Sequence, residues 1–270
     1  MTISELQADR VVEAVYAVKA KRKLRTRGGA PYLALELVDQ TGRIDARVWS
    51  DVELLDGRFA EGDAVRVLGR VELFRDRLQL DVRSLEASDV DPGSLTPAIR
   101  RDADELRGFL EFLAGELVHP GLQATVAAVL ADAPLAERPA TPDGHHSYAG
   151  GLLEHTVAVA TICRETAQLH PRLRGDLLLA AALLHDVGRT LELGPGPAFT
   201  LTEEGRLLGH VTLGVRLIDA RAEELTAVQK AELLHCVAAH HDPRSARIAE
   251  ASVLHHANAL DAVAATRPTG

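Results

Sequence analysis

Alternating apolar and polar residues run through the first third of the chain and predict β-strands. The alternation marks five segments, at residues 11–18, 32–39, 43–49, 64–74 and 77–85. Gln40, Thr41 and Gly42 form a tight turn between the second and third, and residues 50–62 between the third and fourth have helical spacing. Five strands with a helix after the third are what a small Greek-key barrel of the OB type requires. Another small β-barrel or sandwich is the alternative.

The apolar spacing changes from two to the helical period beyond residue 102. A stretch at 87–97, which holds two prolines, a glycine and several turn formers, separates the two patterns. Helical spacing marks residues 103–117, 122–133, 152–169, 175–188, 203–225, 228–241 and 247–266. We therefore expect two domains: an OB-type five-stranded β-barrel at 1–88 and an all-α helical bundle at 102–270, joined by a linker at 89–101.

Composition excludes several classes of protein. Hydrophobic residues make up 46% and charged residues 26% of the chain, which is typical of a globular protein. The longest apolar run, residues 177–184, is far shorter than the roughly 18 residues that a membrane span needs. The N-terminus lacks the apolar core of a secretory signal, and two cysteines make no disulfide framework. We expect a cytoplasmic protein without a membrane partner.

Charge is divided unevenly between the two expected domains. Residues 1–88 hold 15 basic and 15 acidic side chains, so the net charge of −9 lies entirely in residues 89–270. The stretch at 19–29 contains no acidic residue, and OB barrels hold single strands near such a position. These features predict nucleic-acid contacts from Lys21, Arg22, Lys23, Arg25, Arg27, Tyr32, Arg47, Trp49, Phe74 and Arg75. The alternatives are that the basic residues only solvate a strand end and that Trp49 belongs to the core.

Histidines and carboxylates recur near the ends of the expected helices. His185 and Asp186 follow an apolar helix directly, and His155 lies 30 residues earlier on another helix. The remaining members are His210, the pair His240 and His241, and Asn258 and Asp261 on the last helix. A helical bundle builds a metal site in its core from imidazole and carboxylate groups that come from several helices.

The motifs resemble those of the HD-domain metal-dependent phosphohydrolases, whose signature is His, then His-Asp, then a distal Asp. The chain resembles the YhaM-type family more closely than this bare signature requires. The segments that carry the resemblance are HHSYAGGLLEHT (145–156), LLHDVGRTLEL (183–193), EGRLLGHVTLG (204–214) and AAHHD (238–242). Members of that family join an N-terminal OB domain to a C-terminal HD domain. The resemblance covers nearly the whole chain and implies a 3′→5′ exoribonuclease that uses divalent metal.

The resemblance also implies roles for single residues. His155, His185 and Asp186 match the ligands of a first ion, and His210, His240 and His241 match those of a second. Asp186 would bridge the two ions. Arg189 replaces the lysine of the HDxGK motif and keeps a cation for phosphate, so we expect Asp186 and Arg189 to be catalytic. Two divalent ions are expected, and manganese is favoured over iron, cobalt, zinc or magnesium.

Two parts of the motif leave alternatives open. The distal Asp of the family falls on Asn258, whose oxygen carries no charge, and Asp261 lies one helical turn further on. Either residue is a candidate for the last ligand. His145 and His146 are candidates for substrate binding or for fixing the loop before the first metal-binding helix.

Together these features predict a metal-dependent 3′→5′ exonuclease acting on single-stranded RNA, with DNA as a further substrate class. The barrel would hold the strand and the HD site would activate water. One alternative is a nucleotide or cyclic-dinucleotide phosphohydrolase. Another is a non-catalytic nucleic-acid-binding protein whose HD site has decayed, which Asn258 keeps open. Assembly into a homo-oligomer is also left open.

Overall fold

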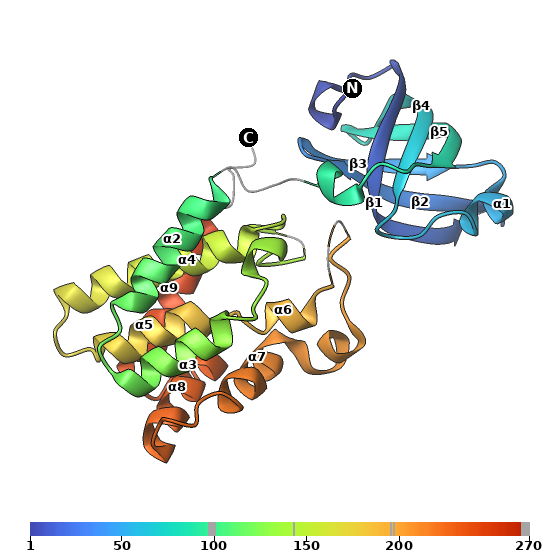
Figure 1. Cartoon of the computed structure of the whole chain (residues 1–270). Coiled ribbons are helices and arrows are strands. Elements are labelled where there is room, and N and C mark those ends of the chain that lie inside the picture. Colours follow the sequence, from blue (N-terminus) through green and yellow to red (C-terminus); the bar gives the residue numbers. More distant parts are fainter. Residues whose placement is uncertain (97–100, 143, 195, 197, 266–270) are drawn as a thin grey trace. The chain divides into compact units, whose positions relative to one another are not determined.

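The computed structural model describes residues 1–96, 101–142, 144–194, 196 and 198–265 (Figure 1). Part of the expected linker and the end of the last expected helix lie outside these residues. The chain divides into two compact units near residue 98. The structure confirms the predicted fold class, a closed five-stranded OB-type barrel followed by a helical domain.

The barrel consists of five strands that close in the order β1-β2-β3-β5-β4. Their bounds are β1 Val11–Arg25, β2 Pro31–Asp39, β3 Gly42–Val48, β4 Ala64–Phe74 and β5 Arg77–Ala87. All pairs are antiparallel except β3 with β5. Strand β1 closes the barrel because its first half pairs with β4 and its second half with β2.

The alternation seen in the sequence separates the inside of the barrel from its outside. Leu33, Leu35 and Leu37 of β2 are buried together with Ile44, Ala46 and Val48 of β3. The neighbouring odd-numbered residues of β3 and even-numbered residues of β2 lie on the outer face. Helix α1, Val52–Asp56, connects β3 to β4, and short 3₁₀ turns lie at Ile3–Glu5 and Pro92–Leu95.

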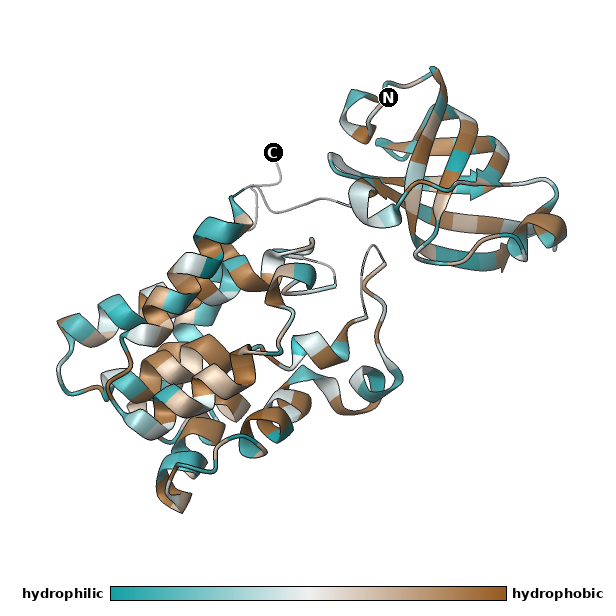
Figure 2. Cartoon of the chain, in the orientation of Figure 1, coloured by the Kyte–Doolittle hydropathy of each residue, from teal (hydrophilic) through white to brown (hydrophobic). Residues whose placement is uncertain are grey.

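The helical domain surrounds one apolar helix. Its elements are α2 Ala103–Gly115, α3 Pro120–Leu130, a 3₁₀ turn at Leu135–Glu137, α4 Gly151–Leu169, α5 Gly175–Leu184, α6 Arg189–Glu192, α7 Glu203–Asp219, α8 Ala227–Ala239 and α9 Ala249–Ala265. Every residue of α5 from Leu177 to Leu184 is buried, and Figure 2 shows the helix as hydrophobic along its length. Helices α3, α4, α8 and α9 pack around it. None of the described helices is long and apolar enough to cross a membrane.

Helix α7 departs from the single straight helix expected at residues 203–225. Gly209 has a left-handed backbone (φ 69°, ψ 158°), which bends the helix just before His210. Thr202 caps the first turn of α7 by accepting from the Gly205 amide. The kink places His210 at the start of a second helical segment, and this decides where its side chain lies.

Candidate metal centre

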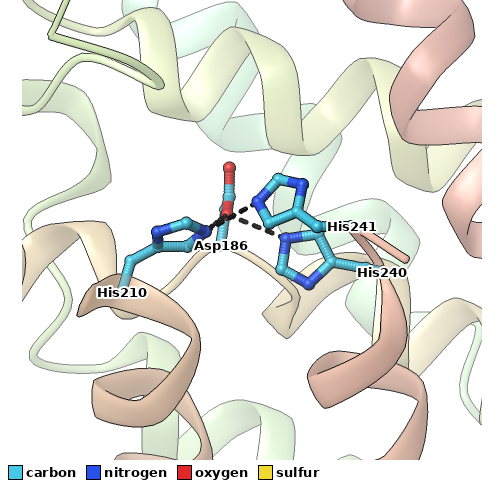
Figure 3. Close-up of side chains that lie close together, drawn as sticks. All are labelled: Asp186, His210, His240 and His241. Atoms are coloured by element: carbon cyan, nitrogen blue, oxygen red, sulfur yellow. Dashed lines mark hydrogen bonds and ion pairs between the residues drawn. The ribbon is translucent and has the colours of Figure 1, made fainter. Parts of the chain in front are cut away.

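Six candidate ligands gather where four segments of the helical domain meet. His155 comes from the first turns of α4, and His185 and Asp186 directly follow α5. His210 follows the kink of α7, and His240 and His241 follow α8. Figure 3 shows Asp186 at the centre, with His210, His240 and His241 pointing toward it. The sequence motifs therefore converge in space.

Asp186 presents one carboxylate oxygen to each of two histidine groups. Its Oδ1 lies 3.2 Å from Nε2 of His210 and 3.4 Å from Nε2 of His240. Its Oδ2 lies 3.7 Å from Nε2 of His155 and 3.8 Å from Nε2 of His185. This arrangement suits a carboxylate that bridges two ions.

The ligand atoms are spaced as neighbours around a common ion. The Nε2 atoms of His155 and His185 are 3.1 Å apart, and those of His210 and His241 are 2.9 Å apart. Ligands at about 2.1 Å from one metal and at right angles to each other are separated by about 3.0 Å. Asp186 Oδ1 and His240 Nε2 are buried, and neither makes a hydrogen bond within the described part of the chain. The two atoms lie 3.4 Å apart without hydrogen-bond geometry, and a bound cation would satisfy both, so the residues fit a divalent metal.

The far sides of the imidazole rings are held by other groups. His185 Nδ1 donates to the carbonyl of Ala182 at 2.8 Å, and His240 Nδ1 donates to that of Val237 at 2.6 Å. His155 Nδ1 instead lies 2.6 Å from Oδ2 of Asp261. Each bond fixes the proton at Nδ1 and leaves Nε2 as the metal-facing atom, which is how proteins orient histidine ligands.

The protonation states also suit a metal. Burial lowers the pKa of His185 to about 3 and that of His241 to about 4, so both imidazoles are neutral at pH 7. Burial alone would raise the pKa of Asp186, but the nearby His185, His240 and Arg189 outweigh it and hold the pKa well below 3.8. Neutral imidazoles and an ionised carboxylate are the forms that bind metal.

A cavity of about 220 Å³ opens beside Asp186. Its wall includes the second predicted catalytic residue, Arg189, and also His145 and Asn258. Asp261 is placed differently, since its Oδ2 contacts Nδ1 of His155 and Nε2 of His146. Of the two candidates for the last ligand, Asn258 therefore lies at the cavity, and Asp261 lies behind His155.

His145 and His146 have different surroundings. His145 lines the cavity, and its ring centre lies 5.2 Å from that of His155. His146 is buried and contacts Asp261 at 3.0 Å and the Tyr148 hydroxyl at 2.8 Å. The geometry favours substrate contact for His145 and a supporting position for His146.

The predicted nucleic-acid residues lie on different faces of the barrel. Tyr32 and Trp49 stack on each other with ring centres 4.9 Å apart, and Trp49 is 52% exposed. Arg22 and Arg47 lie on the same outer face, because both pair across the sheet with Ala34. The structure thus brings two aromatic rings and two arginines onto one face of the barrel.

Lys21 and Lys23 lie on the opposite face of β1 from Arg22. They pair across the sheet with Leu35 and Leu33, whose side chains are in the core. Lys21 Nζ lies 3.2 Å from Asp56 of α1, and Lys23 Nζ contacts Glu53 and Asp56. These contacts tie β1 to α1, so the uninterrupted basic stretch in the sequence meets acidic side chains in space.

The other predicted barrel residues lie at hairpin ends. Arg25 donates to the carbonyl of Gly29 within the β1–β2 turn, and Arg27 belongs to that turn. Phe74 and Arg75 lie at the β4–β5 turn, with the guanidinium of Arg75 5.3 Å from the centre of the Phe74 ring. Both turns border the face on which OB barrels bind strands.

One residue at the centre was not predicted from the sequence. Glu192 is buried at the end of α6, where it accepts from Arg189 at 2.6 Å and from the His210 amide at 3.1 Å. Its only sequence signal is its place three residues after Arg189. Its partner His210 is 18 residues away, so no local spacing indicates the contact.

Comparisons with known proteins agree with both domains. Residues 15–87 match the OB-fold nucleic acid binding domain family, and residues 152–263 match the HD domain family. Similar proteins include the 3′-5′ exoribonuclease YhaM of Bacillus velezensis, at 30% identity over 93% of this chain and 84% of that protein. The protein of the same name from Halalkalibacterium halodurans is 30% identical over 95% of this chain and 84% of its own length.

Among solved structures, the second OB-fold domain of replication protein A from Methanococcus maripaludis is 26% identical, with a TM-score of 0.28. The match covers 33% of this chain and 94% of the replication protein A domain. The full-length relatives, the two domain matches and the convergent histidines and aspartate agree with one another. The chain belongs to the YhaM family of 3′-5′ exoribonucleases.

Proposed function

We propose that this protein hydrolyses single-stranded RNA from its 3′ end with the help of two divalent ions, most suitably manganese. The observation that carries the proposal is the convergence of five histidines on the two oxygens of Asp186, beside a cavity. The 3′→5′ direction and the RNA substrate come from the names of the relatives. The same assay with single-stranded DNA tests DNA as a second substrate class.

The ligands divide into two sets. His155, His185 and Asp186 would hold one ion, and Asp186, His210, His240 and His241 would hold the other. Divalent metal bound there lowers the pKa of a water and offsets the negative charge that develops on the phosphate. Imidazole ligands favour transition metals over calcium.

The remaining residues of the cavity would place the substrate. Arg189 has a buried Nε that makes no hydrogen bond within the described residues, and a guanidinium binds phosphate oxygens in a fixed geometry. The Asn258 amide and the His145 ring border the same space and would contact the nucleotide being removed. Asp186, in turn, would keep the two ions at a fixed separation.

The barrel would hold the RNA strand upstream of the scissile bond. Trp49 offers an exposed ring, stacked on the half-buried Tyr32, on which bases would stack, and Arg22 and Arg47 lie on the same face for phosphates. Base stacking on aromatic side chains is tolerant of sequence, which suits a nuclease that removes every kind of nucleotide. Lys21 and Lys23 would contribute less, because acidic side chains of α1 already pair with them.

A labelled-RNA assay tests the proposal. Single-stranded RNA carrying a 5′ label is incubated with Mn²⁺ and wild type, Asp186→Ala or Asp132→Ala, a control in which the carboxylate removed is 84% exposed. We expect a ladder that shortens from the 3′ end with wild type and the control. Asp186→Ala should lose the activity by more than about 100-fold, since it removes a ligand shared by both ions. Intact RNA with all three proteins would refute the proposal.

A further inference from the structure

The buried carboxylate of Glu192 connects the part of the site that would bind phosphate with the part that would bind metal. Glu192 Oε2 accepts from the Arg189 guanidinium at 2.6 Å. Its Oε1 accepts from the backbone amide of His210 at 3.1 Å and lies 3.5 Å from Nδ1 of the same residue. The Glu192 side chain is only 9% exposed. One side chain therefore contacts both the candidate phosphate ligand and a candidate metal ligand.

The bend in α7 explains why His210 has an amide available for this contact. The left-handed backbone at Gly209 interrupts the helix, so the His210 amide lies at the start of the second helical segment without a partner in the first. A carboxylate at such a helix start is favoured by the exposed amides and by the helix dipole. Glu192 thus stabilises the bend as well as the side chain that follows it.

Two glycines let α6 approach α7 closely enough for the contact. A Cβ at Gly188 would lie 1.9 Å from the carbonyl oxygen of His210, and a Cβ at Gly205 would lie 2.3 Å from that of Glu192. No side chain fits at either position without moving the backbone. The distance between Glu192 and His210 is therefore set by close backbone packing.

The Glu192 carboxylate pairs with a permanent positive charge, because the Arg189 guanidinium lies 2.6 Å from its Oε2. Hydrogen bonds to an ionised carboxylate are shorter and about twice as strong as neutral ones. Arg189 uses one terminal nitrogen for Glu192, and its buried Nε lies 3.8 Å from Oδ1 of Asp186, which leaves the other terminal nitrogen for a phosphate.

We propose that Glu192 is a positioning residue with two separate tasks: through Oε2 it orients Arg189 toward the phosphate, and through Oε1 it orients His210 toward the metal. This inference rests on the proposed function for its first task only. Because each oxygen serves a different partner, the loss of Glu192 has two effects that can be measured apart. One is weaker metal binding through His210, and the other is weaker RNA binding through Arg189.

The test combines calorimetry with steady-state kinetics on the whole 270-residue chain. Wild type, Glu192→Gln and Glu204→Gln are prepared free of metal, and Mn²⁺ binding is measured by titration calorimetry. Glu204 is the matched control, because it too pairs with an arginine, Arg216, at 2.9 Å, but it is exposed on the first turn of α7. We expect Glu192→Gln to weaken Mn²⁺ binding by about 10- to 100-fold and the control to leave it unchanged.

The same proteins are then compared on single-stranded RNA at saturating Mn²⁺, with and without Arg189→Ala. We expect Glu192→Gln to raise KM about 10-fold when Arg189 is present and to leave KM unchanged when Arg189 is absent. Its effect on Mn²⁺ affinity should be the same in both backgrounds. Glu192→Asp, which keeps the charge but is one methylene shorter, should bind Mn²⁺ more tightly than Glu192→Gln and thereby separate loss of charge from loss of fold.

Unchanged Mn²⁺ affinity in Glu192→Gln would overturn the proposal, as would equal losses in Glu204→Gln. A KM effect that persists without Arg189 would also overturn it. If wild type binds Mn²⁺ but leaves RNA intact, the proposed function fails, and the calorimetric comparison alone then supports or overturns the task of Glu192 at His210.

Discussion

At the scale of single residues, the metal-facing histidines differ in what holds their outer nitrogen. His185 and His240 donate to backbone carbonyls, which no side-chain substitution removes. His155 and His210 face the carboxylates of Asp261 and Glu192. A carboxylate partner raises the basicity of the imidazole and thereby strengthens its bond to a metal. The two carboxylates are therefore the outer groups that mutation can test.

Asp261→Asn should weaken the first metal set without removing a ligand from the cavity. The amide loses the charge that fixes His155 at Nδ1, so we expect Mn²⁺ affinity to fall by about 10- to 100-fold. Titration calorimetry of the metal-free protein measures this. Asp242→Asn, which removes a carboxylate that pairs with exposed Arg244, is the control. Equal affinities in Asp261→Asn and wild type would contradict this account of Asp261.

Asn258→Asp tests whether position 258 faces the metal. Asn258 and Asp186 line the same cavity, so a second carboxylate there would repel the first when no cation is bound. We expect the melting temperature of the variant to lie below that of wild type in chelator and above it in Mn²⁺. Differential scanning calorimetry measures both values. A shift of the same sign in chelator and in Mn²⁺ would place residue 258 away from the ions.

The sequence predicted the inward-facing members of the site better than their supports. His155, His185 and His240 lie at the end of an apolar helix or on its buried face, where the sequence pattern points them into the core. Glu192 and the contact between His146 and Asp261 depend on chain segments that are far apart in the sequence. The contact between Glu192 and His210 also depends on the left-handed backbone at Gly209, which a glycine permits but does not require.

At the scale of elements, an ion pair between the buried Glu250 and the half-exposed Arg174 fastens the start of α5 to the start of α9. Glu250 accepts from the Arg174 amide at 2.8 Å and from its guanidinium at 3.1 Å, and its side chain is 5% exposed. Burial would raise the pKa of Glu250, but the hydrogen bonds from Arg174 lower it below 4.5. The lowered pKa means that the charged form stabilises the fold.

Glu250→Gln should therefore cost about 2 kcal/mol of unfolding free energy at pH 7. Because the pKa is lowered in the folded state, this stabilisation is present above pH 4.5 and is lost as the pH falls through the folded pKa. Denaturant unfolding of wild type and variant should thus give curves that converge below pH 4.5. Glu232→Gln removes the more exposed partner of the same arginine and should cost less than about 1 kcal/mol. A constant difference at all pH values would contradict this role of the charge.

The two faces of β1 give a matched pair of barrel variants. Arg22→Gln should weaken binding of a single-stranded RNA and lower the slope of log affinity against log salt by about 0.7. Lys23→Gln should change both far less, because Lys23 faces Glu53 and Asp56. Fluorescence anisotropy at several salt concentrations, without Mn²⁺, measures the slopes. Equal slopes for the two variants would contradict the assignment of faces.

Alternation predicted the existence of the five strands but not the face that each basic residue occupies. Val12, Tyr16 and Val18 are buried in β1, so extending the alternation places Lys21 and Lys23 outside. A shift in register between Val18 and Ala20 reverses this parity. Such a bulge inserts one residue and turns the following side chains to the other face. Its position depends on pairing with β2 and leaves no mark in the local pattern.

At the scale of the whole molecule, charge separates the two domains. The net charge of −9 lies in residues 89–270, while residues 1–88 are neutral overall. RNA is therefore disfavoured by the helical domain except where cations or arginines offset its charge. Bound divalent ions would supply that offset at the cavity beside Asp186. Under the proposed function, the ions would thus help to admit the substrate as well as to hydrolyse it.

We expect Asp186 to lie between two divalent ions. Crystals grown with Mn²⁺ and measured at the manganese absorption edge test it directly, because anomalous scattering locates each ion independently of activity. We expect two peaks, one between Asp186 and the pair His155 and His185, and one between Asp186 and His210, His240 and His241. Both peaks should be lost in Asp186→Ala crystals. The absence of any peak beside Asp186 in wild type would contradict the account.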